Sequence, residues 1–213
     1  MMEQDRSNSL CIPHPLERRL ANMTEGFDLA SLRARLLLQP PLASEKDLPI
    51  ASVAIIINPK DRGGSILLIR RVERSSDPWS GQIGFPGGHK SPVDRGFLQT
   101  AMREAAEEVG VVLSQHQLLG ALPLVITRSR RVQVVPFVFA LRSEVIVRIN
   151  REVAESFWVP LSELMRLEAK KRSVHVVEGD LEVNSYDYNR RIIWGLTFRI
   201  LNLLLNKRSE DDL

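Results

Sequence analysis

A glycine pair followed by an acidic helix constrains this chain more than any other stretch. The segment reads GQIGFPGGHKSPVDRGFLQTAMREAAEEVGV over residues 81–111. At 3.6 residues per turn, its apolar side chains fall on one stripe, and Glu104, Glu107 and Glu108 fall on the neighbouring arc. The sequence therefore predicts a helix with one face packed on a core and one face that carries carboxylates.

The acidic arc predicts a cation site. Negative charge near the C-terminal end of a helix is disfavoured by the helix macrodipole, and Glu104 and Glu108 repel each other as i,i+4 neighbours. Carboxylate oxygens at this spacing suit Mg²⁺ or Mn²⁺ rather than zinc, because no His or Cys ligand set accompanies them. The plainer alternative is a solvated acidic face paired with Arg103.

The glycine pair predicts a close backbone approach to a ligand. Gly87 and Gly88 lack a Cβ atom, so their peptide groups can reach a bound molecule directly. A glycine turn that leads into a helix also suits phosphate oxygens.

Composition restricts the function classes. With 213 residues and 44% hydrophobic content, the chain is expected to form one domain with extensions. The single Cys11 excludes an intramolecular disulfide, and without a signal sequence we expect a cytoplasmic protein. No apolar run reaches the roughly 18 residues that span a bilayer. A net charge of +3 and 6% aromatic residues do not favour nucleic acid as a partner.

Hydrophobic periodicity predicts a β-rich chain with inserted helices. The N-terminal extension, residues 1–49, is expected to hold a short helix over 28–38, with Asp28 as its N-cap, and a linker. The main domain is expected to span 50–207, and an acidic tail to span 208–213. Its predicted strands cover 51–58, 65–71, 117–127, 132–141 and 144–149. Its predicted helices cover 94–109 and 192–206. A strand is expected to pass into a helix over 155–164, and a hairpin over 174–186 is expected to turn at 179–180.

The acidic helix resembles the Nudix box, G-x5-E-x7-R-E-U-x-E-E-x-G-U, in which U is apolar. The second half of the box matches at Arg103, Glu104, Ala105, Glu107, Glu108, Gly110 and Val111. In the first half, Arg95 stands where the pattern has Glu, and Gly88 lies one residue further away. A loop that is one residue longer resembles that of the branch that contains coenzyme A diphosphatases, in which an Asp can stand near the missing Glu. In this chain that residue would be Asp94, and its expected partner is Arg103.

An upstream segment resembles a second signature of that branch, LLTxRSAxxxRxxxGxxxFPGG. The segment LLIRRVERSSDPWSGQIGFPGG aligns with it without gaps and matches at Leu67, Leu68, Arg71, Gly81 and residues 85–88. Asp77 stands where the signature has its second Arg, which reverses the charge at a position where an anionic substrate could lie.

The resemblance implies an α/β fold, an α/β/α sandwich around a mixed sheet, and hydrolysis of a nucleoside diphosphate linked to another group. It implies that Glu104, Glu107 and Glu108, with the Gly88 carbonyl, hold the metal. It also implies that Arg103 orients the acids and that Arg71, Gly87 and Gly88 contact the substrate. Coenzyme A or its thioesters is the favoured substrate.

Several points stay open at this stage. ADP-ribose, dinucleoside polyphosphates or oxidised nucleotides are the alternative substrates, and a nucleotide-sensing module without catalysis is the alternative class. Glu152 and Glu155 are candidates for the general base, with ordinary surface carboxylates as the commoner explanation. The sequence also leaves a homodimer open.

Overall fold

The computed structural model describes residues 29–39, 48–60, 63–74, 79–127, 131–176 and 179–207. The expected cap Asp28, most of the linker, Asp77 and the acidic tail lie outside these ranges. None of the described helices is both long enough and apolar enough to cross a membrane.

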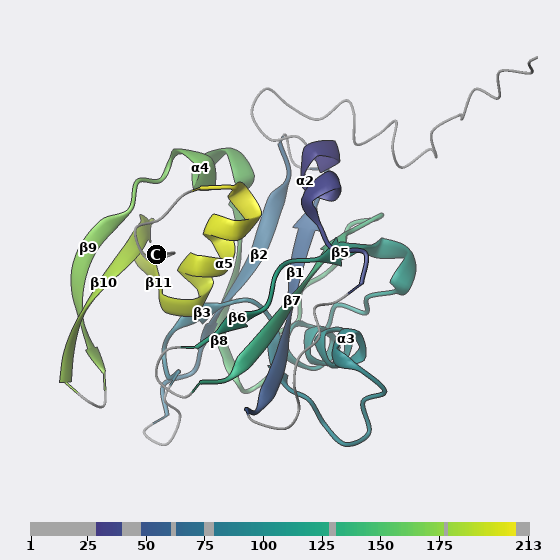
Figure 1. The fold of residues 1–213 in the computed structure, drawn as a ribbon, viewed down its shortest axis with the longest axis horizontal. Helices are drawn as coiled ribbons and strands as arrows, with labels where there is room; N and C mark the ends of the chain where they lie inside the picture. Colours follow the sequence, from purple (N-terminus) through teal and green to yellow (C-terminus); the bar gives the residue numbers. More distant parts are fainter. Residues whose placement is uncertain are drawn as a thin grey trace, which may run out of the picture.

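A mixed sheet forms the centre of the molecule (Figure 1). Its main path runs β3-β2-β1-β7-β5, and β4, β6 and β8 pair with β1, β7 and β2 respectively. Strands β1 and β7 are parallel over eight residue pairs, and the other pairs are antiparallel. The bounds are β1 Ile50–Asn58, β2 Ser65–Arg71, β3 Ile83–Gly84, β4 Gly87–His89, β5 Leu118–Ala121, β6 Val125–Ile126, β7 Gln133–Ala140 and β8 Val153–Pro160.

Helices cover both faces of this sheet. The helix α3, Phe97–Val109, packs with one buried cluster that includes Ala54, Ile56 and Phe139. The helices α2 (Leu29–Arg35), α4 (Leu161–Arg166) and α5 (Gly195–Leu205) contribute to the second cluster. The expected α/β/α sandwich around a mixed sheet is confirmed.

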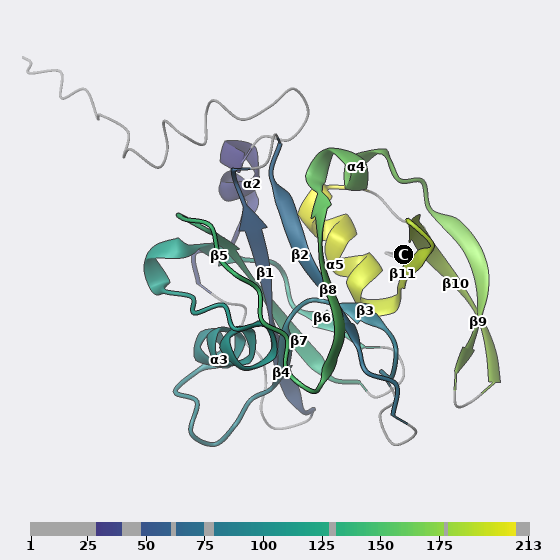
Figure 2. The same ribbon diagram turned by 180° about the vertical axis from the view of Figure 1, so that it is seen from behind.

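A smaller sheet lies beside α5 and contacts the main sheet near β3 (Figures 1 and 2). It consists of β9 Lys170–Val176, β10 Gly179–Tyr188 and β11 Arg191–Trp194 in the order β11-β10-β9. The hairpin between β9 and β10 was expected, but its turn was placed too late. Gly179 already pairs with Val176, so the connection lies before Gly179.

The strands that line the core follow the sequence closely. The β-branched run of β1 is buried at eight of its nine positions, as expected for a strand covered on both faces. The stretch predicted as one strand over 117–127 is instead divided into β5 and β6. Pro123 lies between them, and a proline cannot donate a backbone N–H to a strand ladder.

The prediction of a strand over 144–149 is wrong. The segment alternates between exposed and half-buried residues as a strand does, but its backbone bonds the end of α3. Arg148 donates its N–H to the carbonyl of Val109 over 2.9 Å, and Asn150 donates to that of Glu108 over 3.0 Å. An extended segment therefore holds the last turn of the acidic helix.

Two helix boundaries also differ from the prediction. The C-terminal helix begins at Gly195 rather than at 192, because residues 192–194 complete β11 and Gly195, with φ of 61°, ends that strand. The acidic helix begins at Phe97 rather than at 94, because the Asp94 carboxylate accepts the Ser91 N–H and so folds the preceding residues into a turn. Its expected end at Gly110, in the left-handed conformation, is confirmed.

Candidate active site

The glycine pair lies tightly between a strand and the acidic helix. In the β1–β4 ladder, Gly88 is paired with Ser52 and Gly87 with Val53. A Cβ atom on Gly87 would lie 2.5 Å from the Ser52 carbonyl oxygen, and one on Gly88 would lie 2.4 Å from Glu104 Oε1. At Gly87 only glycine fits, because a Cβ atom would clash with the backbone of β1; at Gly88 a Cβ atom would displace the Glu104 carboxylate from its present position.

Glu108 is a buried carboxylate held by the glycine turn. Its side chain is 2% exposed, and the Gly87 N–H donates to Oε2 over 2.9 Å. Arg71, at the end of β2, contacts Oε1 at the longer distance of 3.4 Å. Burial raises the pKa of Glu108 to about 7, even though the Gly87 N–H and the Arg71 charge both favour the ionised form.

Glu104 lies one turn earlier on the same face. Its pKa is raised as well, first by burial, and the neighbouring Arg103 offsets part of that effect across 2.9 Å. The negative charge of Glu152 raises the pKa of both Glu104 and Glu108, so this carboxylate acts on the same site. The three acids thus lie close enough for the charge of each to act on the same site.

Arg103 is the centre of an ion-pair network. Its Nε and Nη2 atoms each lie 3.1 Å from an oxygen of Asp94, and Nη2 also donates to the His89 carbonyl. Nη1 contacts Glu104 and Glu107, each at 2.9 Å. Arg103 therefore links the loop before α3, the glycine strand β4 and the acidic helix.

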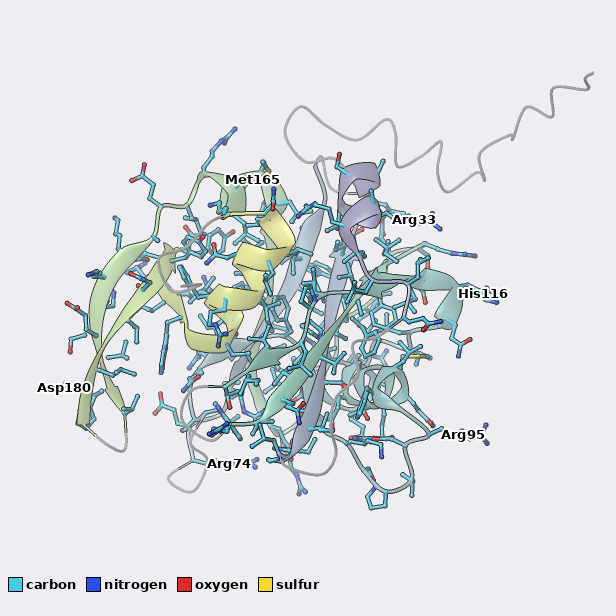
Figure 3. All side chains as sticks on the ribbon, in the orientation of Figure 1. Arg33, Arg74, Arg95, His116, Met165 and Asp180 are labelled. Carbon is cyan, nitrogen blue, oxygen red and sulfur yellow. The ribbon has the colours of Figure 1, made fainter. Side chains whose placement is uncertain are left out.

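Asp94 takes the place that the sequence pattern reserves for a glutamate. It is buried, it accepts bonds from Arg103, the Ser91 N–H and the Thr100 hydroxyl, and the Arg103 bond is the main cause of its lowered pKa. Arg95, which occupies the aligned position, points into solvent (Figure 3). The expected contact between Asp94 and Arg103 is present.

The acids are not gathered into a metal site. Glu107 is 54% exposed, and Arg103 holds both Glu104 and Glu107. Within the ranges that the structure describes, no three His, Cys, Asp or Glu side chains converge as metal ligands. To bind a cation together with Glu108, Glu104 and Glu107 must turn away from Arg103.

The donor set nevertheless fits a hard divalent cation. Glu108 is buried and Glu104 is partly buried, with 14% of its side chain exposed, and burial is the main cause of both raised pKa values. Carboxylate and carbonyl oxygens are the ligands that Mg²⁺ and Mn²⁺ prefer. A cation bound here would remove the cost of keeping these carboxylates ionised.

A cavity of about 170 Å³ adjoins the glycine pair. Its lining is mostly apolar and includes Ala51, Val53, Val134, Leu196 and Ile200. Arg71, Gly87 and Gly88 lie on its wall, so the same groups that contact or approach the acids also border this space. The arrangement can hold an apolar or aromatic group beside a charged one.

The two candidates for the general base lie in different surroundings. Glu155 is paired with Arg70 at 3.4 Å and with Arg191, and the Arg191 bond chiefly lowers its pKa. Glu152 follows the segment that holds the end of α3, and its charge reaches Glu104 and Glu108. The sequence alone could not show which of the two residues acts on the acids, because this depends on how β8 pairs with β2.

A family model described as the NUDIX domain matches residues 47–178. The Uncharacterized Nudix hydrolase NudL of Photorhabdus laumondii is 35% identical over 182 residues, which cover 81% of this chain and 92% of that protein. The protein of the same name from Yersinia enterocolitica is 32% identical over 183 residues, covering 84% and 92%.

The fold also matches a solved structure. A MutT/nudix family protein from Enterococcus faecalis superposes with a TM-score of 0.50 over 90% of this chain and 73% of that chain, at 16% identity. This likeness concerns the fold, and the family is shown by the NUDIX match and by the NudL relatives. This chain belongs to the Nudix hydrolase family.

The raised pKa of Glu108 predicts how stability depends on pH in the metal-free protein. A carboxyl that binds its proton more tightly when folded stabilises the protein fully below pH 4.5, and this contribution is lost as the pH rises through about 7. Relative to Glu108→Gln, the wild-type free energy of unfolding should fall by on the order of 3 kcal/mol across that window. Urea unfolding in the presence of a chelator measures it.

The matched control for this experiment is Glu107→Gln, on the exposed side of the same helix. It should keep the wild-type pH dependence. Parallel curves for wild type and Glu108→Gln would contradict the assignment of a buried, tightly protonated Glu108.

Proposed function

We propose that this chain hydrolyses the diphosphate bond of a nucleoside diphosphate linked to another group, with Mg²⁺ or Mn²⁺ as cofactor. The observation that carries the proposal is the pair of carboxylates formed by the buried Glu108 and the partly buried Glu104, which lies against Gly87 and Gly88 beside a cavity. The glycine strand can accept the diphosphate, and the cavity can accept an apolar or aromatic part of the substrate.

Glu104, Glu107 and Glu108, with the Gly88 carbonyl, would hold the cation. A divalent ion offsets phosphate charge and lowers the pKa of a bound water. Arg103 restrains Glu104 and Glu107 and is itself fixed by Asp94, so it orients the acids. Arg71 borders the cavity and contacts Glu108, which places its guanidinium where it can also bind a phosphate oxygen.

Glu152 is the better candidate for the general base. Its carboxylate acts on the site, whereas Glu155 is occupied by two arginines. A base must lie within reach of the water that it deprotonates, and it must be free to accept that proton.

Coenzyme A or its thioesters is the favoured substrate. The support is the upstream signature, whose Arg71 and glycine strand both border the cavity. ADP-ribose, dinucleoside polyphosphates and oxidised nucleotides share the same diphosphate chemistry and form the alternative. A nucleotide-sensing module is disfavoured because every acid of REAAEE is retained.

A substrate panel tests the reaction and its specificity. Purified protein with Mg²⁺ or Mn²⁺ is incubated with coenzyme A, an acyl thioester of it, ADP-ribose, a dinucleoside tetraphosphate and an oxidised nucleotide, and the products are separated by chromatography. We expect 3′,5′-ADP and 4′-phosphopantetheine from coenzyme A. Turnover of ADP-ribose without turnover of coenzyme A would reject the favoured substrate, and no turnover of any would reject the enzyme.

The role of Glu152 is tested by Glu152→Gln, with Glu155→Gln as its control. We expect Glu152→Gln to lower kcat by about 100-fold or more, with little change in KM. Glu155→Gln should leave kcat near the wild-type value. A wild-type kcat in Glu152→Gln would assign the proton transfer to another group.

A further inference from the structure

The extended segment 142–150 presents a free edge at the surface. Val145 and Val147 are half-buried and pack on the cluster beneath α3, while the residues between and beside them face solvent. Ile146 is 76% exposed, which is high for a large apolar side chain in such an ordered position. The segment thus shows an exposed face with Glu144, Ile146 and Arg148 in alternation.

In the part of the chain that the structure describes, the backbone N–H groups of the segment are hydrogen-bonded to the rest of the protein on one side only. Arg148 and Asn150 direct their N–H groups at the end of α3. In an extended chain, alternate residues point their peptide groups to opposite sides, so Val145, Val147 and Ile149 point theirs the other way. No hydrogen bond among the described residues uses these three N–H groups. The edge is therefore ready to pair with another strand.

The segment is complementary to a second copy of itself. In an antiparallel pair centred on Ile146, Glu144 of one copy lies opposite Arg148 of the other, and the two Ile146 side chains meet. The same register pairs Val145 with Val147, so the outward-pointing peptide groups of both copies face each other. Charge, apolar contact and backbone direction thus select one register.

We propose that two copies of this chain associate through antiparallel pairing of residues 144–148 about a twofold axis at Ile146. Such an axis produces the same contact twice, as symmetric dimers require. The Lys60–Glu144 contact does not oppose this pairing, because it is long, at 3.4 Å, and the Glu144 side chain is 81% exposed. A contact of this size is small for an interface, so the dimer should be weak, with a dissociation constant in the micromolar range.

Pairing also bears on the acidic helix. The segment that would pair is the one whose Arg148 and Asn150 hold the carbonyls of Val109 and Glu108. The dimer contact thus lies on the segment that bonds the last turn of α3, and not in the candidate active site itself. This inference does not depend on which substrate the protein hydrolyses.

Sedimentation equilibrium of the full chain over a micromolar concentration series tests the proposal. Glu144→Arg and Arg148→Glu should each weaken the dimer by about tenfold or more, because each places like charges opposite one another at two symmetric positions. The double variant Glu144→Arg/Arg148→Glu should restore the wild-type dissociation constant. Ile146→Asp should give a monomer.

The control is Glu182→Arg, an equally exposed acid on β10, which should leave association unchanged. Circular dichroism melting checks that each variant is folded. A wild type that stays monomeric throughout the series would overturn the proposal. A dimer that both single charge reversals leave intact, or that the double variant fails to restore, would also overturn it.

Discussion

The hydrogen bond from the Gly87 N–H to the buried Glu108 carboxylate is the interaction on which the site depends. It joins the glycine strand to the acidic helix across 2.9 Å, and Gly87 can lie this close to β1 only because it carries no side chain. Because the parallel pairing of β1 with β7 fixes β1 in the middle of the sheet, and β4 pairs with β1, the glycine strand has a fixed position relative to the helix. The proposal that these residues bind a metal rests on the carboxylate charge that is held here in a place shielded from water.

The acidic helix is held from three directions. Its inner face packs through Ala101, Ala105 and Val109 on the sheet. Arg103 fastens its outer face to the Asp94 turn, and the extended segment after β7 bonds the carbonyls of its last turn. These restraints position Glu104 and Glu108, while Glu107 stays at the exposed side, where its contact with Arg103 can be exchanged.

Much of this could be predicted from the sequence, because the helix and the core strands carry periodic patterns that burial enforces. The apolar stripe of α3, the buried run of β1 and the glycine end of the helix all express local rules. The segment after β7 shows where such rules stop. Its alternation is that of a strand, but whether a strand pairs depends on what lies beside it, and here that neighbour is a helix end.

In the candidate active site, too, some features could be predicted from the sequence and others depend on the fold. Matching to a family pattern selected Glu104, Glu107 and Glu108, and the loop that is longer by one residue predicted that Asp94 pairs with Arg103. The structure shows this pairing, and it adds what the pattern does not contain: the Ser91 N–H and the Thr100 hydroxyl also bond the buried Asp94 carboxylate. The distinction between Glu152 and Glu155 depends on strand pairing over some eighty residues of separation.

Mn²⁺ binding, followed by electron paramagnetic resonance of the free ion, tests the central claim most directly. The account expects saturable binding to wild type. It expects the affinity to fall by more than about tenfold in Glu104→Gln and in Glu108→Gln, since even residues that only orient metal ligands cost 10- to 100-fold. Glu182→Gln, on the distant hairpin, should bind as wild type does. Unchanged Mn²⁺ affinity in both site variants, with the fold intact, would contradict the claim that the buried carboxylates beside the glycine pair hold the cation.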